Sequence, residues 1–224
     1  LNTLFALVDQ GFYKEEDFNI DADGKYTLKA GLAVPSYGEV QPGDIKYQNQ
    51  NTDLVIDDND RVDIGQTTSP WTYGVNLNLN YKRFNLFVLG TGQTGAIGNK
   101  LTGFNGYYSP NGANAKYSEV VLGRWTPATA NTATFPRLSA KNNNNNFQNS
   151  TFWTYDNSYF AINRAQLTYE FDDVLCEKLN IQDLNVNVSG TNLFEISENK
   201  DIRQLRIGSN PMDRSFTLGV RVSF

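Results

Sequence analysis

Apolar and polar residues alternate along several segments of this chain, which is the pattern of a β-strand with one apolar and one polar face. The alternation is unbroken over residues 72–81, where Tyr73, Leu77 and Tyr81 share one face and Asn78 lies on the other. Residues 215–224 alternate in the same way and end on an aromatic residue. Such a strand needs lipid or a protein core on one side and water on the other. The last segment is typical of the closing strand of an outer-membrane barrel.

Short and long connections alternate between the expected strands. The five strands predicted by periodicity are residues 72–81, 84–91, 152–171, 184–194 and 215–224. Lys82 and Arg83 are only long enough for a tight hairpin, whereas residues 92–151 are rich in Gly, Asn, Thr, Ser and Pro and cannot bury a core by themselves. The connector after the third strand is expected to contain one or two helical turns over residues 173–179. A sixth strand is expected within residues 4–12.

The connection lengths also predict a topology, because periplasmic turns of bacterial barrels are short and extracellular loops are long. On this basis the Lys82–Arg83 hairpin is expected to be periplasmic, and the expected fold class is all-β, with the strands forming part of an antiparallel transmembrane β-barrel with long extracellular loops. The expected divisions are residues 1–70, a partial strand plus an extracellular loop with an acidic Asn/Asp segment; 71–92, a β-hairpin of the barrel wall; 93–151, a long extracellular loop; and 152–224, the last three barrel strands.

Aromatic residues lie near the ends of these strands, where a barrel places girdles at the two membrane interfaces. The predicted girdle residues are Tyr73, Tyr81, Phe84, Tyr169, Phe171, Phe216 and Phe224. The eight-residue separation of Tyr73 and Tyr81 corresponds to a vertical span of about 20 Å at the usual strand rise and tilt. In the third strand the apolar parity changes between Ile162 and Leu167, which predicts a bulge near residues 163–165.

A soluble β-sandwich is the alternative, since it also has alternating strands joined by polar loops. A sandwich more often places aromatic residues in mid-strand and keeps its loops shorter than about 15 residues. Periodicity alone leaves both folds open. Five or six strands are also too few to close a barrel with lipid outside and a wet lumen, so the chain is expected to be part of a longer protein.

Composition excludes several classes of function. The net charge of −5 comes without a basic stripe, which argues against a nucleic-acid partner. The chain has no histidine and a single cysteine, Cys176, which excludes a Cys/His zinc site, a Ser-His-Asp triad and an internal disulfide within it. The neighbouring carboxylates Asp57 and Asp58 would face opposite ways on a strand and make a poor acid–base pair. No catalytic site and no organic cofactor are expected, and the protein is not predicted to be an enzyme.

One acidic segment has the spacing of a calcium loop, in which oxygen ligands at alternate positions wrap a hard cation. The candidate ligands are Asn49, Asn51, Asp53, Val55 through its carbonyl, Asp57 and Asp60. Two positions depart from the pattern, because Asn49 stands where an Asp is usual and Leu54 stands where a Gly makes the sharp turn. The alternative is a solvated loop whose acids cap turns.

Several motifs in order resemble the SusC/RagA group of TonB-dependent outer-membrane transporters of Bacteroidetes. They are Gly43-Asp-Ile-Lys-Tyr47, the acidic segment up to Arg61 with Ile64-Gly65, Phe135-Pro-Arg-Leu-Ser139, Asn149-Ser-Thr-Phe-Trp153, Val188-Ser-Gly-Thr-Asn-Leu-Phe194 and Thr217-Leu-Gly-Val220. The resemblance implies that the chain forms the C-terminal strands of a large barrel of about 22 strands, with a plug and a TonB box upstream, in the bacterial outer membrane. It also implies TonB-dependent import of oligosaccharides or peptides, with a SusD-like surface lipoprotein as lid.

Aromatic residues in or near the long loop are candidates for contact with a substrate or with the lid. They are Tyr107, Tyr108, Trp125, Trp153 and Tyr155. Exposed rings beside polar loops can stack on sugars or hold peptide side chains, but they can equally pack the loop onto its neighbours. Two functions of other classes stay open at this point: a secreted, soluble, calcium-binding carbohydrate-binding or adhesion module, and a barrel with a structural role.

Overall fold

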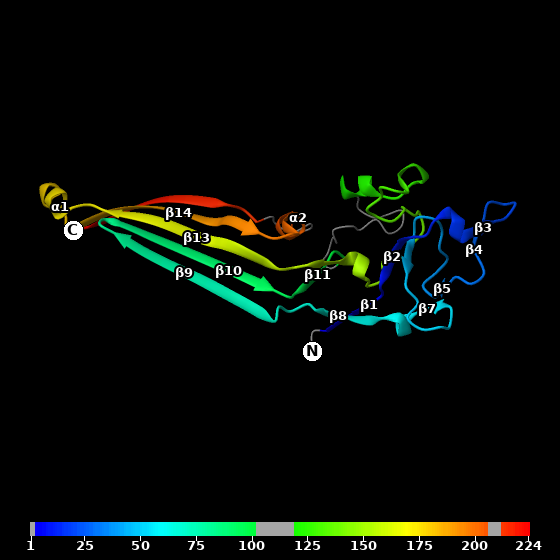
Figure 1. Cartoon of the computed structure of the whole chain (residues 1–224). Helices are drawn as coiled ribbons and strands as arrows, with labels where there is room; N and C mark the ends of the chain where they lie inside the picture. Colours follow the sequence, from blue (N-terminus) through cyan, green and yellow to red (C-terminus); the bar gives the residue numbers. More distant parts are fainter. Residues whose placement is uncertain (1–2, 102–118, 206–211) are drawn as a thin grey trace. The chain divides into compact units, whose positions relative to one another are not determined.

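The computed structural model describes residues 3–101, 119–205 and 212–224 (Figure 1). They divide into two compact units. The first, here called the loop unit, comprises Leu1–Thr67 and Ile97–Tyr155, and the second, the sheet unit, comprises Thr68–Ala96 and Asp156–Phe224. Within the described ranges, no helix is both long enough and apolar enough to cross a bilayer.

The sheet unit is built on one antiparallel sheet with the strand order β15-β14-β13-β10-β9 (Figure 1). Its strands are β9 (Trp71–Tyr81), β10 (Phe84–Thr94), β13 (Tyr159–Glu170), β14 (Asp183–Ile196) and β15 (Ser215–Ser223). Helix α1 (Asp173–Leu179) connects β13 to β14, and α2 (Lys200–Leu205) follows β14. Apolar and polar residues alternate along most of these strands, and antiparallel pairing aligns the alternations across the sheet.

The sheet confirms most of the local predictions. Lys82 takes the left-handed conformation with φ 53° in the two-residue hairpin, so that Tyr81 pairs with Phe84. Helix α1 covers the expected residues, and Asn180 ends it with φ 57°. The β13 register shifts by one residue at Asn163, which is the predicted bulge. It restores the face of the apolar side chains, because Ile162 and Ala165 then both lie on the same side as Leu167.

The third predicted strand, residues 152–171, is wrong at its start. Residues Thr151–Trp153 form a 3-10 turn, and Thr154–Asp156 form a separate short strand, β12, that pairs with β11 (Ile97–Asn99). Strand β13 begins only at Tyr159. The reason is the side chain of Trp153, which is fully buried and anchors this turn in the loop unit instead of extending a strand.

The loop unit consists of short two-stranded sheets around two apolar clusters. Its further strands are β1 (Thr3–Ala6) with β8 (Val62–Gln66), β2 (Asp9–Phe12) with β6 (Ile45–Tyr47), β3 (Phe18–Ile20) with β4 (Tyr26–Leu28), and parallel β5 (Val34–Pro35) with β7 (Val55–Ile56). The larger cluster contains Leu7, Ile45, Tyr47, Ile56 and Trp153, and the smaller contains Tyr13, Phe18 and Val40. Short paired segments of this kind leave most of the backbone to be satisfied by loops and side chains.

The predicted sixth strand within residues 4–12 is two strands, and neither belongs to the five-stranded sheet. Between β1 and β2 the chain changes partner. The Leu7 amide donates to the Asn149 carbonyl at 3.0 Å, and the Thr151 amide donates to the Leu7 carbonyl at 2.9 Å. The N-terminal segment and the end of the predicted long loop are therefore joined, and together they bury the core that residues 92–151 could not bury alone.

Candidate functional site

The sheet unit exposes a continuous apolar face. Leu77 on β9 pairs with Val88 on β10, and Val188 on β14 pairs with Leu167 on β13 and with Leu218 on β15. Val88 is half-buried, and the other side chains named are exposed; Leu218, for example, is 71% exposed. An apolar face that spans five strands is much larger than the patches that monomeric soluble proteins leave in water.

The opposite face is polar, and its side chains form hydrogen bonds both along a strand and between neighbouring strands. Its hydrogen bonds include Arg164 Nη2 to Gln166 Oε1 at 2.8 Å, Gln166 Nε2 to Thr168 Oγ1 at 3.2 Å, and a bond between the side chains of Asn85 and Asn80. Phe87 and Leu89 are apolar exceptions on this face, and both are half-buried. One face of the sheet is therefore suited to hydrocarbon and the other to water.

The predicted girdle residues gather near the two ends of the strands. At the hairpin end, the ring centroids of Phe84 and Tyr169 lie 4.8 Å apart, and those of Tyr169 and Phe171 lie 5.0 Å apart. At the other end, Tyr73 stacks on Phe160 with 6.2 Å between centroids. Its ring fits there because the facing residue is Gly92, where a Cβ would lie 2.5 Å from the ring.

The remaining girdle residues are at the edges of the same face. Tyr81 is 69% exposed, Phe216 is 73% exposed opposite Gly190, and Phe224 is 87% exposed beyond the end of β15. Near the hairpin, Arg83 Nη1 lies 2.8 Å from Asp172 Oδ2. The hydrogen bond to Arg83 holds the pKa of the Asp172 carboxyl below its ordinary value, and the Leu175 amide adds to that effect.

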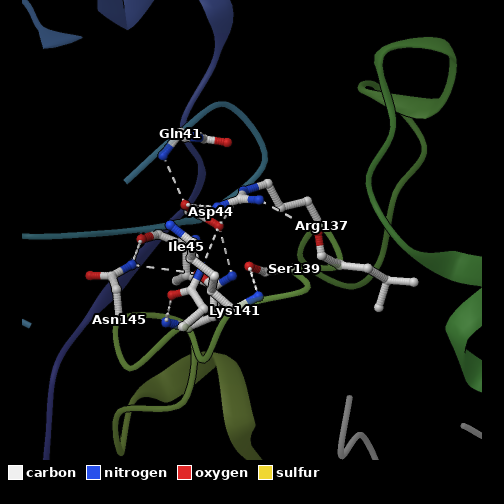
Figure 2. Close-up of polar contacts among 10 residues, drawn as sticks. Gln41, Asp44, Ile45, Arg137, Ser139, Lys141 and Asn145 are labelled. Carbon is white, nitrogen blue, oxygen red and sulfur yellow. Dashed lines mark hydrogen bonds and ion pairs between the residues drawn. The ribbon is translucent and has the colours of Figure 1, made fainter. Parts of the chain in front are cut away.

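A buried polar network organises the loop unit around Asp44, whose side chain has no exposed surface (Figure 2). Asp44 Oδ1 accepts the Nδ2 groups of Asn143 and Asn146, each at 2.8 Å. Its Oδ2 accepts the Gln41 amide at 2.8 Å and Arg137 Nη2 at 3.2 Å, and Arg137 Nε lies 2.8 Å from Oδ1. Burial raises the pKa of Asp44, while the Arg137 charge and these hydrogen bonds oppose the rise.

The same network fixes the Asn-rich run of the predicted loop against β6. Asn146 Oδ1 accepts the Ile45 amide at 2.8 Å, and Asn145 Nδ2 donates to the Ile45 carbonyl at 2.9 Å. The Tyr47 hydroxyl donates to the Asn145 carbonyl, and Trp153 Nε1 donates to the Asn146 carbonyl, both at 2.7 Å. The sequence analysis did not predict this role of the asparagines, because a run of Asn residues is typical of a solvated loop.

Trp153 does not have the exposed position expected of a substrate-contacting residue. Its indole is fully buried, with Phe147 and Phe135 stacked near it and Phe152 edge-on at 4.7 Å. The expectation of a contact residue is therefore wrong for Trp153, which is a core residue. Tyr155 is half-buried, and its ring lies against Gly98, where a Cβ would be 2.2 Å from the ring. Tyr107 and Tyr108 lie outside the described residues.

Trp125 is half-buried and lies against the backbone of Gly43. A Cβ at Gly43 would lie 2.4 Å from the Trp125 ring, and the φ of 87° at this position also favours glycine. The Trp125 amide donates to the Phe135 carbonyl at 2.8 Å. A cavity of about 790 Å³ lies beside the indole, and we name it the Trp125 cavity. Its lining includes Gln10, Phe12, Glu15, Trp125, Pro127 and Asn131.

A second cavity of about 530 Å³ lies over the Asp44 network and is lined mostly by polar residues. They include Tyr37, Gln41, Arg137, Ser139, Lys141 and Asn144. Burial and the hydrogen bond to Asp58 raise the pKa of Tyr37 to about 12. Its hydroxyl, and Arg61 Nε, donate to Asp58 Oδ1 at 2.9 Å each.

The acidic segment 49–60 closes on itself through its side chains. Asn49, Asn51 and Asp53 each accept the amide two residues ahead, at 2.8–3.0 Å. Asp60 is buried and accepts the amides of Gln50 and Asp57. Asp57 accepts the Asn59 amide, and Val55 begins β7. In these contacts the acidic and amide side chains cap turns, as the alternative interpretation of a solvated loop expects.

Leu54 takes φ 58° in this segment, so it makes the turn for which a glycine is expected. Within the described part of the chain, however, no three carboxylate, thiol or imidazole groups converge as a metal site. Calcium binding through the carbonyl of Val55 and the side chains of the segment stays a prediction.

No protein-family model matches the chain. Two curated proteins of Formosa agariphila are similar to it. TonB-dependent receptor P3 is 26% identical over 206 residues, which cover 84% of this chain and 20% of the relative. TonB-dependent receptor P26 is 26% identical over 198 residues, which cover 81% of this chain and 20% of that protein. The chain thus spans about a fifth of the length of these relatives.

Solved structures of the RagAB peptide importer have a similar fold. The open-open state superposes with a TM-score of 0.60 at 18% identity, and the closed-closed state with 0.56 at 20% identity. Each likeness covers 99% of this chain and 22% of the solved chain. The relatives are receptors and importers by name, not enzymes. Together with the ordered motifs, these similarities support the resemblance of the chain to a fragment of a SusC/RagA-like TonB-dependent transporter.

Proposed function

We propose that the protein to which this chain belongs imports oligosaccharides or peptides across the bacterial outer membrane, with energy delivered through TonB. The observation that carries the proposal is the two-faced sheet. Its apolar face, with Leu77, Val188 and Leu218 exposed, is costly in water and favourable in lipid. Its polar face, with Asn78, Asn80 and Asn85, can line a wet passage.

The five strands form part of a closed barrel of about 22 strands in this proposal. Strands β9 and β15 are the two edges of the sheet in the described residues. An open edge in a bilayer would leave backbone groups without hydrogen bonds, so further strands of the longer protein would pair with both edges. The aromatic groups at the two ends of β9 and β10 would then lie at the two membrane interfaces.

The loop unit is assigned to the extracellular side, where it meets the substrate and a SusD-like lipoprotein lid. Support comes from the order of short and long connections, since the Lys82–Arg83 hairpin is short enough for a periplasmic turn. It also comes from the cavities beside Trp125 and over the Asp44 network, because ligand sites are concave and carry a few placed polar groups.

Isolation of the whole protein from outer membranes tests the proposal. We expect it in the outer-membrane fraction, together with a lipoprotein, and we expect uptake to stop when TonB is removed. Recovery as a soluble, monomeric protein would contradict the proposal and favour the secreted calcium-binding module. That module is not favoured by the exposed apolar face, which a soluble sandwich would bury between its sheets.

A further inference from the structure

The Trp125 cavity is formed by two segments of the loop unit, residues 10–16 and 125–131. Its volume of about 790 Å³ is that of a small-molecule or side-chain site. Trp125, Phe12, Pro127 and Ala130 give it apolar surface, and Gln10, Lys14, Glu15, Glu16 and Asn131 give it polar groups. Ligand sites likewise combine aromatic and apolar walls with placed polar and charged groups.

Backbone hydrogen bonds hold the walls of this cavity in place. The Gly43 amide donates to the Tyr13 carbonyl and the Tyr13 amide donates to the Asp44 carbonyl, both at 2.8 Å. Since the Trp125 ring lies on Gly43, the indole and the 10–16 segment are both tied to the buried Asp44 network. On the other wall, the hydroxyls of Thr126 and Thr129 lie 2.8 Å apart and cap the turn over Pro127–Thr129. The cavity is therefore preformed, which lowers the entropy cost of binding.

The rim of the cavity carries an uncompensated negative charge. Lys14 Nζ lies 3.6 Å from Glu16, so these two charges balance each other. The Glu15 carboxylate, in contrast, has no ion pair and no hydrogen bond to any residue that the structure describes. Glu15 and Trp125 line the same cavity, and this pair favours a cation, because a carboxylate and the face of an indole both attract positive charge.

We propose that the Trp125 cavity binds the basic side chain of a peptide, a lysine or an arginine. The charged end pairs with Glu15 and lies over the indole of Trp125, while the methylene stem packs on Phe12 and Pro127. A neutral sugar could stack on the indole and donate a hydroxyl hydrogen bond to Glu15, but it carries no positive charge to neutralise that carboxylate, as a lysine or arginine does. This inference rests on the proposed function and selects peptides over oligosaccharides as the ligands of this site.

Calorimetry on the purified whole receptor, together with the lipoprotein that accompanies it, tests the inference. The probes are capped pentapeptides that differ only at the central residue, lysine or glutamine, and a neutral oligosaccharide. We expect the lysine peptide to bind most tightly, with an advantage that falls as salt is raised. In the wild type we expect about a threefold preference for the lysine peptide over the glutamine peptide, and Glu15→Gln should remove it. Trp125→Leu should weaken binding of the lysine peptide about tenfold.

Glu177→Gln is the matched control, because Glu177 is an exposed carboxylate on α1 in the sheet unit. It is expected to leave all affinities unchanged. Equal binding of the lysine and glutamine peptides, or a Glu15→Gln variant with unchanged preference, would overturn the inference. Tighter binding of the oligosaccharide that is lost in Trp125→Leu would overturn it in favour of a sugar. The proposed function is tested separately, by outer-membrane location and uptake. If the receptor passes those tests but gives one of the binding results above, only the inference about the Trp125 cavity is overturned.

Discussion

At the residue scale, the chain depends on a few polar side chains that are buried with full sets of partners. Asp44 is the main example, because it accepts hydrogen bonds from Gln41, Arg137 and two asparagines that lie 99 and 102 positions away in the sequence. Sequence patterning does not reveal this, since Lys141-Asn-Asn-Asn-Asn-Asn-Phe147 has no apolar period. Only the tertiary contact with Gly43-Asp44 shows which of those asparagines point inward.

Removal of the Asp44 carboxylate should destabilise the loop unit. Asp44→Ala leaves the Arg137 guanidinium and two buried amides without their acceptor, and we expect a loss of about 3 kcal/mol in the free energy of unfolding of this unit. Hydrogen exchange of the loop-unit amides in the whole receptor measures it. Asp23→Ala, at an exposed turn, is the control and should change little. Equal protection in wild type and Asp44→Ala would show that the network contributes nothing to stability.

The ion pair between Arg83 and Asp172 should give a defined pH dependence. The pKa of Asp172 is lowered in the folded state, so its contribution to stability is complete above the ordinary aspartate pKa of about 3.9. It is lost as the pH falls through the lowered pKa. Arg83→Gln should therefore lower the thermal midpoint near neutral pH and have a smaller effect at strongly acidic pH. Lys82→Gln, in the same turn, should show no such dependence; an effect of Arg83→Gln that is constant with pH would refute the assignment.

At the element scale, the alternation of side chains predicts the sheet strands well, because each strand must separate a wet face from an apolar one. The hairpin at Lys82, the bulge at Asn163 and helix α1 all follow from local patterns. The structure of residues 152–158 could not be predicted from the local pattern, because burial of Trp153 overrides the tendency of this segment to form a strand. The prediction of one strand within residues 4–12 is wrong for a related reason. The two strands found there pair with segments far along the chain, and such partners leave no periodic signal.

The apolar face of β9 should be sensitive to charge, and the polar face should not. Leu77→Arg places a guanidinium near mid-strand on the apolar face, which costs about 2–4 kcal/mol in a bilayer. Asn78→Arg is the matched control on the adjacent residue and should cost much less. Urea titration of the whole receptor folded into phospholipid vesicles compares them. A negligible effect of Leu77→Arg would mean that this face does not contact lipid.

The segment 49–60 allows a test of the calcium prediction. If Ca²⁺ binds the folded protein, millimolar calcium should raise the thermal midpoint, because a ligand that binds only the folded state stabilises it. Asp53→Ala and Asp57→Ala should each reduce that rise, whereas Asp23→Ala should leave it intact. No rise in the wild type, or an equal rise in all variants, would leave the acids with their turn-capping role alone.

At the scale of the whole molecule, the sheet and the loop unit have different sequence signals. Period-two alternation and aromatic residues at the strand ends mark the sheet in the sequence, so its strands and its apolar face could be predicted. The sequence signal of the loop unit lies in motifs such as Gly43-Asp-Ile-Lys-Tyr47. The structure gives the physical reason for this motif: Gly43 makes room for the Trp125 ring, and Asp44 is the buried centre of a polar network. The cavities of the loop unit could not be predicted, because they depend on contacts between distant segments.

The most direct test of the account is the environment of successive residues on β9 in the native membrane. In the whole receptor carrying Cys176→Ser, single cysteines at positions 75 to 80 are labelled with a fluorophore and exposed to lipids bearing a quencher in the acyl chain. The account predicts strong quenching at positions 75, 77 and 79 and weak quenching at 76, 78 and 80, which instead react with a water-soluble thiol reagent. Uniform labelling by the water-soluble reagent with no lipid quenching would contradict it.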